Sequence, residues 1–136
     1  MVRLLSFFLC THACCFVGSL LYCIAASAIL ALLQDDSDRT IQTYALQQLH
    51  AGVHLHWAEM SNEVSRIEEL YEDSSFPERQ LAALVASKVY YHLGALDEAL
   101  SFALGAGDLF DIENMQDQYV DTLIGAFVPY HIFPSV

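Results

Sequence analysis

Apolar residues recur at helical spacing through most of the chain, and the stretch from Arg79 to Phe110 has the clearest pattern. Its first half carries largely apolar side chains at steps of three and four, at Leu81, Leu84, Val85, Lys88, Val89 and His92. Gly94 fits the left-handed position that ends a helix, and Asp97 and Glu98 place negative charge at the start of a second helix. That second helix has a small apolar face made of Ala99, Leu100, Ala103 and Leu104. The stretch therefore predicts two antiparallel helices that pack closely and stack in a row.

Three more helices are predicted around this pair. Ser37 or Asp38 can cap a helix that ends near Gly52. Its expected apolar face consists of Ile41, Tyr44, Ala45, Leu49 and Val53. The expected face of the next helix is Trp57, Met60, Val64, Ile67, Leu70 and Tyr71, opposite the solvated Glu59, Glu63, Glu68 and Glu72. Ser75 is the candidate cap of the helix pair, with Pro77 in its first turn.

The last predicted helix runs from about Asn114 to Phe127, and its inward residues are Tyr119, Val120, Leu123 and Ile124. We expect Pro129 and Pro134 to prevent a regular helix beyond it. No stretch alternates with period two, so no sheet is expected. The fold class is therefore predicted as all-α, the N-terminal part of an α-solenoid built from antiparallel helix pairs, with an extra apolar N-terminal helix.

Charge divides the chain into an apolar head and an acidic body. Residues 4–34 contain no Asp, Glu, Lys or Arg, whereas all 17 acidic residues lie from Asp35 onward, against 5 basic residues in the whole chain. The formal net charge of -12 argues against nucleic acid, whose phosphates require Lys and Arg, and against an anionic membrane surface. A basic protein partner or a simply solvated surface agrees with this charge.

The head has the outline of a secretory signal peptide, with Arg3, an apolar run and small residues ending at Ala28. The uncharged run also exceeds the roughly 20 residues that span a bilayer. Residues 1–33 therefore support an alternative: a small membrane-tethered or secreted helical protein. The four cysteines, Cys10, Cys14, Cys15 and Cys23, all lie here, with His12 among them. Zinc sites use separated ligand pairs that bracket a folded loop, so we interpret these residues as part of an apolar helix.

Candidate chemistry in the body is weak. His50 and His54 are four residues apart and could face one metal ion, with His56 nearby, but the Glu of a metalloprotease helix is absent. Gly105-x-Gly107 lacks a third glycine and a preceding strand, so it is interpreted as a helix-ending turn. No nucleophile has a partner constellation. We therefore predict no enzyme activity, no cofactor, and no catalytic, cofactor-binding or metal site.

One acidic pattern is suggestive of a partner. Glu113, Asp117 and Asp121 repeat every four residues, which would place like charges on one helical face. Such a face would suit a basic partner. It does not resemble a calcium loop, which needs alternating oxygen ligands and a central glycine turn.

Several runs carry a family resemblance. They are residues 82–95 and 103–110, with 57–59 and 67–73 before them and 119–120 and 122–124 after them. Together they resemble the N-terminal rod of the proteasome non-ATPase regulatory subunit 1 family, over about residues 25–124. The resemblance implies a non-catalytic scaffold of the regulatory-particle base, in cytoplasm and nucleus, which contributes to ubiquitin-dependent protein breakdown through contacts with other regulatory-particle subunits.

The resemblance also divides the chain. Residues 1–24 form an apolar extension, which is either signal-like or a spurious or alternatively spliced addition, residues 25–124 the helical rod domain and residues 125–136 a divergent C-terminal tail. It implies a full-length family chain several times longer, with a ring of repeats after the rod and a tail on which a ubiquitin receptor docks. We therefore interpret this sequence as a fragment holding the rod's first helices. Tyr119, Leu123 and Phe127 are expected to be exposed at its end and to favour association.

Overall fold

The computed structural model of the protein describes residues 26–34, 38–112 and 117–132. Its elements are a helical segment at residues 26–31, α2 (Arg39–Ser61), α3 (Val64–Glu72), α4 (Arg79–Leu93), α5 (Leu96–Gly105), the 3₁₀ helix η1 (Gly107–Leu109) and α6 (Gln118–Ile132). No strand occurs in the described ranges, so the all-α prediction is confirmed. The proposed N-terminal helix, the four cysteines, His12, Ser37, Glu113 and Pro134 lie outside these ranges.

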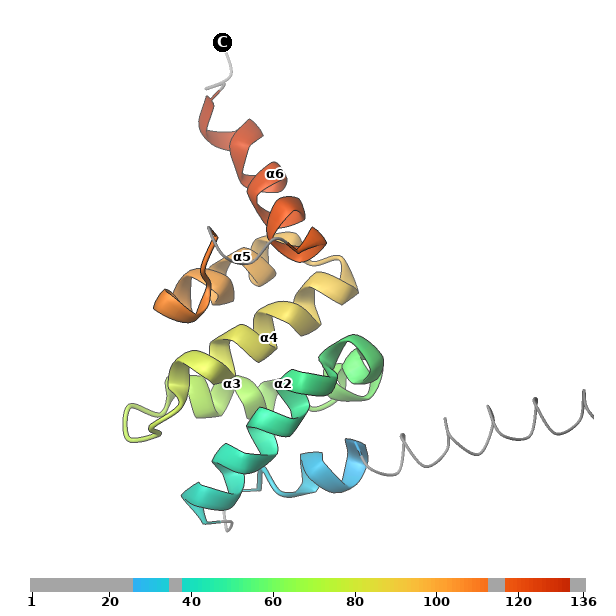
Figure 1. Ribbon diagram of the computed structural model, residues 1–136, viewed down its shortest axis with the longest axis vertical. Coiled ribbons are helices and arrows are strands. Elements are labelled where there is room, and N and C mark those ends of the chain that lie inside the picture. Colours follow the sequence, from blue (N-terminus) through green and yellow to red (C-terminus); the bar gives the residue numbers. More distant parts are fainter. Residues whose placement is uncertain (1–25, 35–37, 113–116, 133–136) are drawn as a thin grey trace, which may run out of the picture.

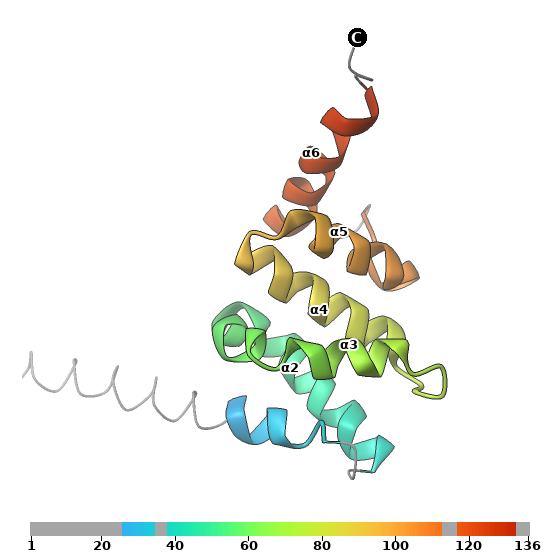
Figure 2. The same cartoon turned by 180° about the vertical axis from the view of Figure 1, so that it is seen from behind.

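The helices stack in layers along the longest axis of the molecule (Figure 1). Helix α4 lies in the middle, with α2 and α3 on one side of it and α5 and α6 on the other, and Figure 2 shows the same order from behind. The pair of α4 and α5 runs antiparallel, as the sequence predicts. This layered stack is consistent with the beginning of an α-solenoid, in which each helix buries its apolar face mainly on its neighbours.

Two apolar cores meet at α4 and explain why that helix is buried almost all round. The first core joins the 26–33 segment, α2 and α3 to one face of α4, through Ala82, Val85, Ala86 and Val89. The second joins the opposite face of α4 to α5 and α6 through Ala83 and Leu84. The small residues of α4 allow both neighbouring layers to approach it closely.

The turn between α4 and α5 is the one that the sequence indicates. Gly94 has φ 79°, a left-handed conformation in which glycine carries no Cβ penalty. The N–H of Ala95 donates to the carbonyl of Tyr90 and the N–H of Gly94 donates to Tyr91, both at 3.0 Å. These two bonds form a Schellman motif that satisfies the last carbonyls of α4. Asp97 and Glu98 lie in the first turn of α5, where their charges favour the helix dipole.

Helix α2 is longer than predicted, and it presents a different face to the core. Asp38 caps it by accepting a hydrogen bond from the Thr40 N–H at 2.8 Å. The helix continues through Gly52, whose missing side chain leaves room for the His56 ring. The break comes instead at residues 62–63, so the predicted helix from Trp57 to Tyr71 is divided between α2 and α3.

The buried face of α2 comprises Gln42, Ala45, Leu46, Leu49, Val53, His56 and Met60. The predictions of Ala45, Leu49 and Val53 are confirmed, whereas Ile41 and Tyr44 are exposed and their prediction is wrong. The face is rotated because Gln42 takes a buried position, where its Nε2 donates to the carbonyl of Gln34 at 2.9 Å. A satisfied polar group can occupy a core position that hydropathy alone assigns to an apolar neighbour.

The start of α4 and the outer face of α5 also differ from expectation. Helix α4 begins at Arg79 after Glu78, so Pro77 precedes the helix and Ser75 is not its cap. Ser75 instead hydrogen-bonds to Asp73 through both its N–H and its hydroxyl. In α5, Ala99 and Ala103 are buried as predicted, but Leu104 is 65% exposed because it faces away from α4.

Helix α6 begins later and ends later than predicted. It runs from Gln118 to Ile132 and continues through Pro129, so the prediction that Pro129 prevents a regular helix is wrong. Tyr119 and Leu123 are buried against α4 and α5, so the predicted exposure of these two side chains is wrong, whereas Phe127 is exposed. None of the helices in the described ranges combines the length and the apolar character needed to cross a membrane.

Candidate functional site

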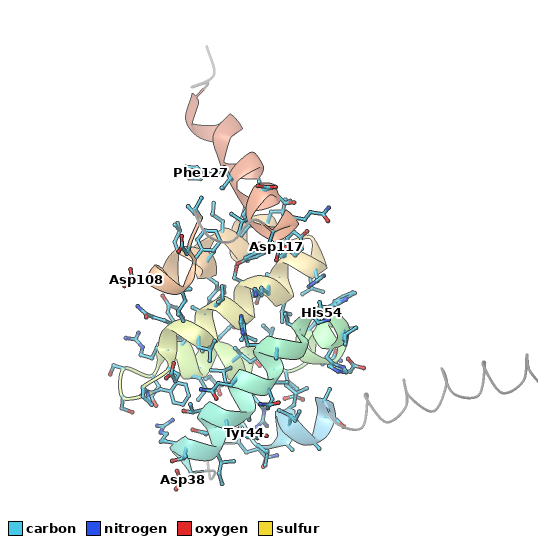
Figure 3. All side chains as sticks on the ribbon, viewed as in Figure 1. Asp38, Tyr44, His54, Asp108, Asp117 and Phe127 are labelled. Carbon is cyan, nitrogen blue, oxygen red and sulfur yellow. The ribbon has the colours of Figure 1, made fainter. Side chains whose placement is uncertain are left out.

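A polar concavity lies where α2, α4 and the start of α6 meet. Its volume is about 490 Å³, and its lining includes His50 and His54 from α2, Lys88 and His92 from α4, and Asp117 just before α6. We call it the Lys88 groove. Figure 3 shows His54 and Asp117 on the same side of the molecule, the side on which α4 ends.

Lys88 is the central cation of the groove. Its ammonium nitrogen lies 3.1 Å from Nε2 of His50 and 5.8 Å from the centroid of the Tyr119 ring. Burial lowers the pKa of Lys88, and the charge of Asp117 opposes that shift. Within the described ranges, no carboxylate lies at ion-pair distance from Lys88. Lys88 is therefore a half-buried cation held by an imidazole and an aromatic face.

Two of the histidines that line the groove, His50 and His92, favour their neutral forms. Burial lowers the pKa of His50, and the neighbouring Lys88 lowers it further. Burial also lowers the pKa of His92, with a smaller contribution from His54. The ring of His92 stacks on Trp57 with centroids 5.7 Å apart, which fixes the edge of the groove. Both shifts favour the neutral imidazole of His50 and His92 beside the Lys88 ammonium group.

A buried hydrogen-bond network fixes the wall of the groove that α6 provides. The hydroxyl of Ser87 donates to the Ala99 carbonyl at 2.5 Å and lies 2.6 Å from the Tyr119 hydroxyl. Burial raises the pKa of Tyr119 to about 12, so this hydroxyl stays protonated over the physiological range. One serine thus connects α4 to α5 and to α6, and it positions Tyr119 beside Lys88.

The residues singled out in the sequence fall in several places. His50 and His54 both line the Lys88 groove, but His56 is buried on another face of α2, with Nδ1 3.7 Å from Oε2 of Glu59. Within the described residues no three His, Cys, Asp or Glu side chains form a group that could hold a metal ion. The absence of a catalytic, cofactor or metal site stays a prediction for the whole chain.

The acidic pattern and the glycine pair can be placed as well. Asp117 directly precedes α6 and Asp121 lies in its first turn, where negative charge is favourable. Glu113 lies outside the described residues, so the predicted acidic face of all three residues stays a prediction. Gly105 ends α5 and Gly107, with φ 58°, opens η1, which confirms the helix-ending turn.

Lys88, His92 and Asp117 were missed as members of one site. The contact between Lys88 and His50 joins residues 38 positions apart, and no local spacing predicts it. The available signal was compositional: Lys88 is the chain's single lysine, and it falls on a helix face that is otherwise apolar. A cation at a semi-buried position requires partners from another element.

Exposed apolar side chains supply a second kind of candidate surface. On α2 they include Ile41, Tyr44 and Leu55, which are spaced at helical intervals along its outer side. At the opposite end of the stack they are Leu104, Leu109, Ile112 and Phe127. Large apolar side chains that remain exposed on neighbouring turns are typical of surfaces that contact other proteins.

Comparison with known proteins gives one consistent family. The family model described as the N-terminal domain of the 26S proteasome subunit RPN2 matches residues 24–134. The chain is 48% identical over 111 residues to the 26S proteasome regulatory subunit rpn2 of Schizosaccharomyces pombe, which covers 82% of this chain and 11% of the relative. It is 44% identical over 112 residues to the 26S proteasome non-ATPase regulatory subunit 1 of Drosophila melanogaster, with 82% and 11% covered.

The Saccharomyces cerevisiae subunit RPN2 is similar to the same degree, at 42% identity over 107 residues, which covers 79% of this chain and 11% of the relative. The chain thus spans about a tenth of the length of these curated relatives. The matched region includes all the described helices, and the family model covers well over half of the sequence. The chain therefore belongs to the family of the N-terminal domain of the 26S proteasome subunit RPN2.

Proposed function

We propose that this chain is a non-catalytic scaffold segment of the proteasome regulatory particle, and that it contributes to ubiquitin-dependent protein breakdown through protein–protein contacts. The observation that carries the proposal is the family match over residues 24–134, together with its relatives, which are named regulatory subunits of the 26S proteasome. The stacked helices support it, because their residues are used for packing and for exposed contact surfaces. Its partners would be other regulatory-particle subunits, in the cytoplasm and nucleus.

Co-purification tests the scaffold role. A tagged full chain would be expressed in budding yeast, whose RPN2 is 42% identical over the matched region, and extracts would be separated on a glycerol gradient. We expect the chain to sediment with regulatory-particle subunits and to be retained with them on affinity resin. A folded chain that stays in the light fractions under all salt conditions would contradict the proposal.

A matched pair of variants makes this test specific to a surface. Tyr44→Arg changes an exposed side chain of α2, and Leu104→Arg changes an exposed side chain of α5 at the other end of the stack. Both leave the cores intact, so each variant should fold. A scaffold contact through one end predicts loss of co-sedimentation for one variant only.

Hydrolysis of casein by the purified chain above the level of a buffer control would contradict the non-catalytic part of the proposal.

A further inference from the structure

The Lys88 groove combines features that point to a ligand. Its lining contains one lysine, Lys88, one carboxylate, Asp117, and three imidazoles, those of His50, His54 and His92. The body elsewhere is strongly acidic, since the chain carries 17 acidic residues against 5 basic ones. At physiological salt the Debye length is about 8 Å, so the local groups rather than the net charge decide what binds there.

Lys88 has unused capacity for an acceptor. An ammonium group carries three N–H donors, and the described contacts of Lys88 are one imidazole nitrogen and one aromatic face. Half-burial makes this charge costly, and Asp117 offsets part of the cost only from beyond ion-pair distance. A carboxylate at hydrogen-bond distance would offset more of it. The exposed Gln118 at the start of α6 also lines the groove and adds a side-chain amide donor.

We propose that the Lys88 groove binds a carboxylate side chain from an acidic segment of a partner protein. The inference rests on the proposed scaffold function, which supplies the reason for a protein partner. The carboxylate would lie between Lys88 and the imidazole of His92, with the Gln118 amide as a further donor. Charge complementarity selects this occupant, because a basic segment would meet the ammonium of Lys88 and an apolar segment would leave it buried without an acceptor.

The chain provides its own reporter for this binding. Trp57 is the single tryptophan, and its ring stacks on His92 at the edge of the groove. A carboxylate beside His92 favours the imidazolium form, and a protonated imidazole quenches indole emission. Binding should therefore lower Trp57 fluorescence at neutral pH.

The test titrates the full chain with an acetylated, amidated tetraglutamate peptide and, in parallel, with the tetraglutamine peptide. We expect saturable quenching by tetraglutamate only, weakened by high salt. Lys88→Gln should reduce the affinity about fivefold or more, because it removes a charge-assisted hydrogen bond. Arg66→Gln removes the same charge outside the groove, where Arg66 pairs with Glu63 at 2.9 Å, and should change the affinity less than about twofold.

Two further measurements keep the proposal falsifiable. Lys88→Arg keeps the charge and should keep most of the affinity, while thermal melts verify that each variant is folded. Equal quenching by tetraglutamine, no saturation, or equal losses for Lys88→Gln and Arg66→Gln would overturn the proposal. Failure here would leave co-sedimentation with the proteasome unaffected, so the two proposals fail separately.

The chain's own acidic residues are the competing occupants. Since Lys88 is the single lysine, carbodiimide treatment reports directly which carboxylate lies at its amine. We expect mass spectrometry to find Lys88 coupled to added tetraglutamate, at a level that Lys88→Arg abolishes. An internal amide from Lys88 to Glu113 or Asp117 that persists in the presence of excess peptide would overturn the proposal.

Discussion

At the scale of single residues, the hydroxyl of Ser87 is the point where three helices share hydrogen bonds. It donates to the Ala99 carbonyl of α5 and meets the Tyr119 hydroxyl of α6, all at buried positions. We predict that Ser87→Ala lowers the free energy of unfolding by about 1–3 kcal/mol, because it leaves buried polar groups without a partner. Urea unfolding followed by circular dichroism measures the change.

A double-mutant cycle separates the hydrogen bond from packing. Tyr119→Phe removes the second hydroxyl, so the double variant Ser87→Ala/Tyr119→Phe should lose less stability than the sum of the two single changes. Strict additivity would mean that the two hydroxyls act independently, contrary to the 2.6 Å contact.

Tyrosine ionisation gives a pH-dependent prediction at the same scale. The hydrogen bond from Tyr90 to Glu68 raises the pKa of Tyr90 to about 12, and burial raises the pKa of Tyr119 to about 12. Both values exceed the ordinary value of 10.0, so the folded state holds these protons more tightly than the unfolded state. The stabilisation that these two protonated tyrosines contribute is therefore fully present below pH 10. It is lost as the pH rises from 10 towards 12.

Absorbance near 295 nm, together with thermal melts between pH 8 and 12, checks this. The variant Tyr90→Phe/Tyr119→Phe should lose less stability over this interval than the parent chain. An identical decline in both proteins would show that other groups cause it.

Residue-scale features were predictable where their cause is local. The left-handed Gly94 and the Asp38 cap depend on neighbours within a few positions, and both were identified from sequence. The Lys88 groove depends on a contact between residues 38 positions apart, so its geometry follows from helix packing. His50 and His54 were noticed for their spacing, but their neighbours in space were not.

At the scale of helices, the close approach between the end of α5 and Tyr71 of α3 depends on Gly105. A Cβ at this position would lie 2.5 Å from the Tyr71 hydroxyl oxygen and 2.9 Å from its Cζ. The Tyr71 ring is held edge-on against Phe102 and beneath Arg79, so it can yield only by disturbing these contacts. We predict that Gly105→Ala destabilises the chain by about 1 kcal/mol, the balance of overpacking against helix propensity.

Gly125→Ala is the matched control. It lies within α6, and a Cβ there would meet no atom within 4 Å. Better helix propensity should therefore raise stability by roughly 0.5–1 kcal/mol. Chemical denaturation of both variants measures the difference, and equal effects would contradict the steric explanation.

Helix ends were less predictable than helix existence. The sequence predicts a helix end near Gly52, because glycine is common at helix ends. In the structure Gly52 lies inside α2, where its missing side chain leaves room for the His56 ring. Pro129 was read as a stop, but it removes one N–H from a helix in which the matching carbonyl belongs to the exposed Gly125, and that carbonyl can bond to water. A local propensity was thus outweighed by packing at Gly52 and by solvent exposure of the Gly125 carbonyl at Pro129.

At the scale of the whole molecule, two cores share α4, and this arrangement explains why helical periodicity predicted the class but not every face. The sequence predicted one largely apolar side for α4, whereas the structure buries two opposite sides of that helix. The division into residues 1–24, 25–124 and 125–136 stays a prediction, because the resemblance alone supports these boundaries. The buried Tyr119 and Leu123 move the expected contact surface to other residues of α5, η1 and α6.

That surface yields a prediction about association. Leu104 is 65% exposed and Phe127 is 43% exposed, with Leu109 and Ile112 also exposed between them in sequence. Figure 3 shows Phe127 and Asp108 on the same side of the molecule. Several exposed apolar side chains at one end of the stack favour association in water. We expect the purified chain to self-associate, and Leu104→Gln/Phe127→Gln to reduce its mean mass in light scattering.

Leu55→Gln is the control: it changes a comparably exposed side chain on α2 and should have a smaller effect. A monomeric parent chain, or an equal effect of Leu55→Gln, would show that the end of the stack formed by α5 and α6 does not drive association.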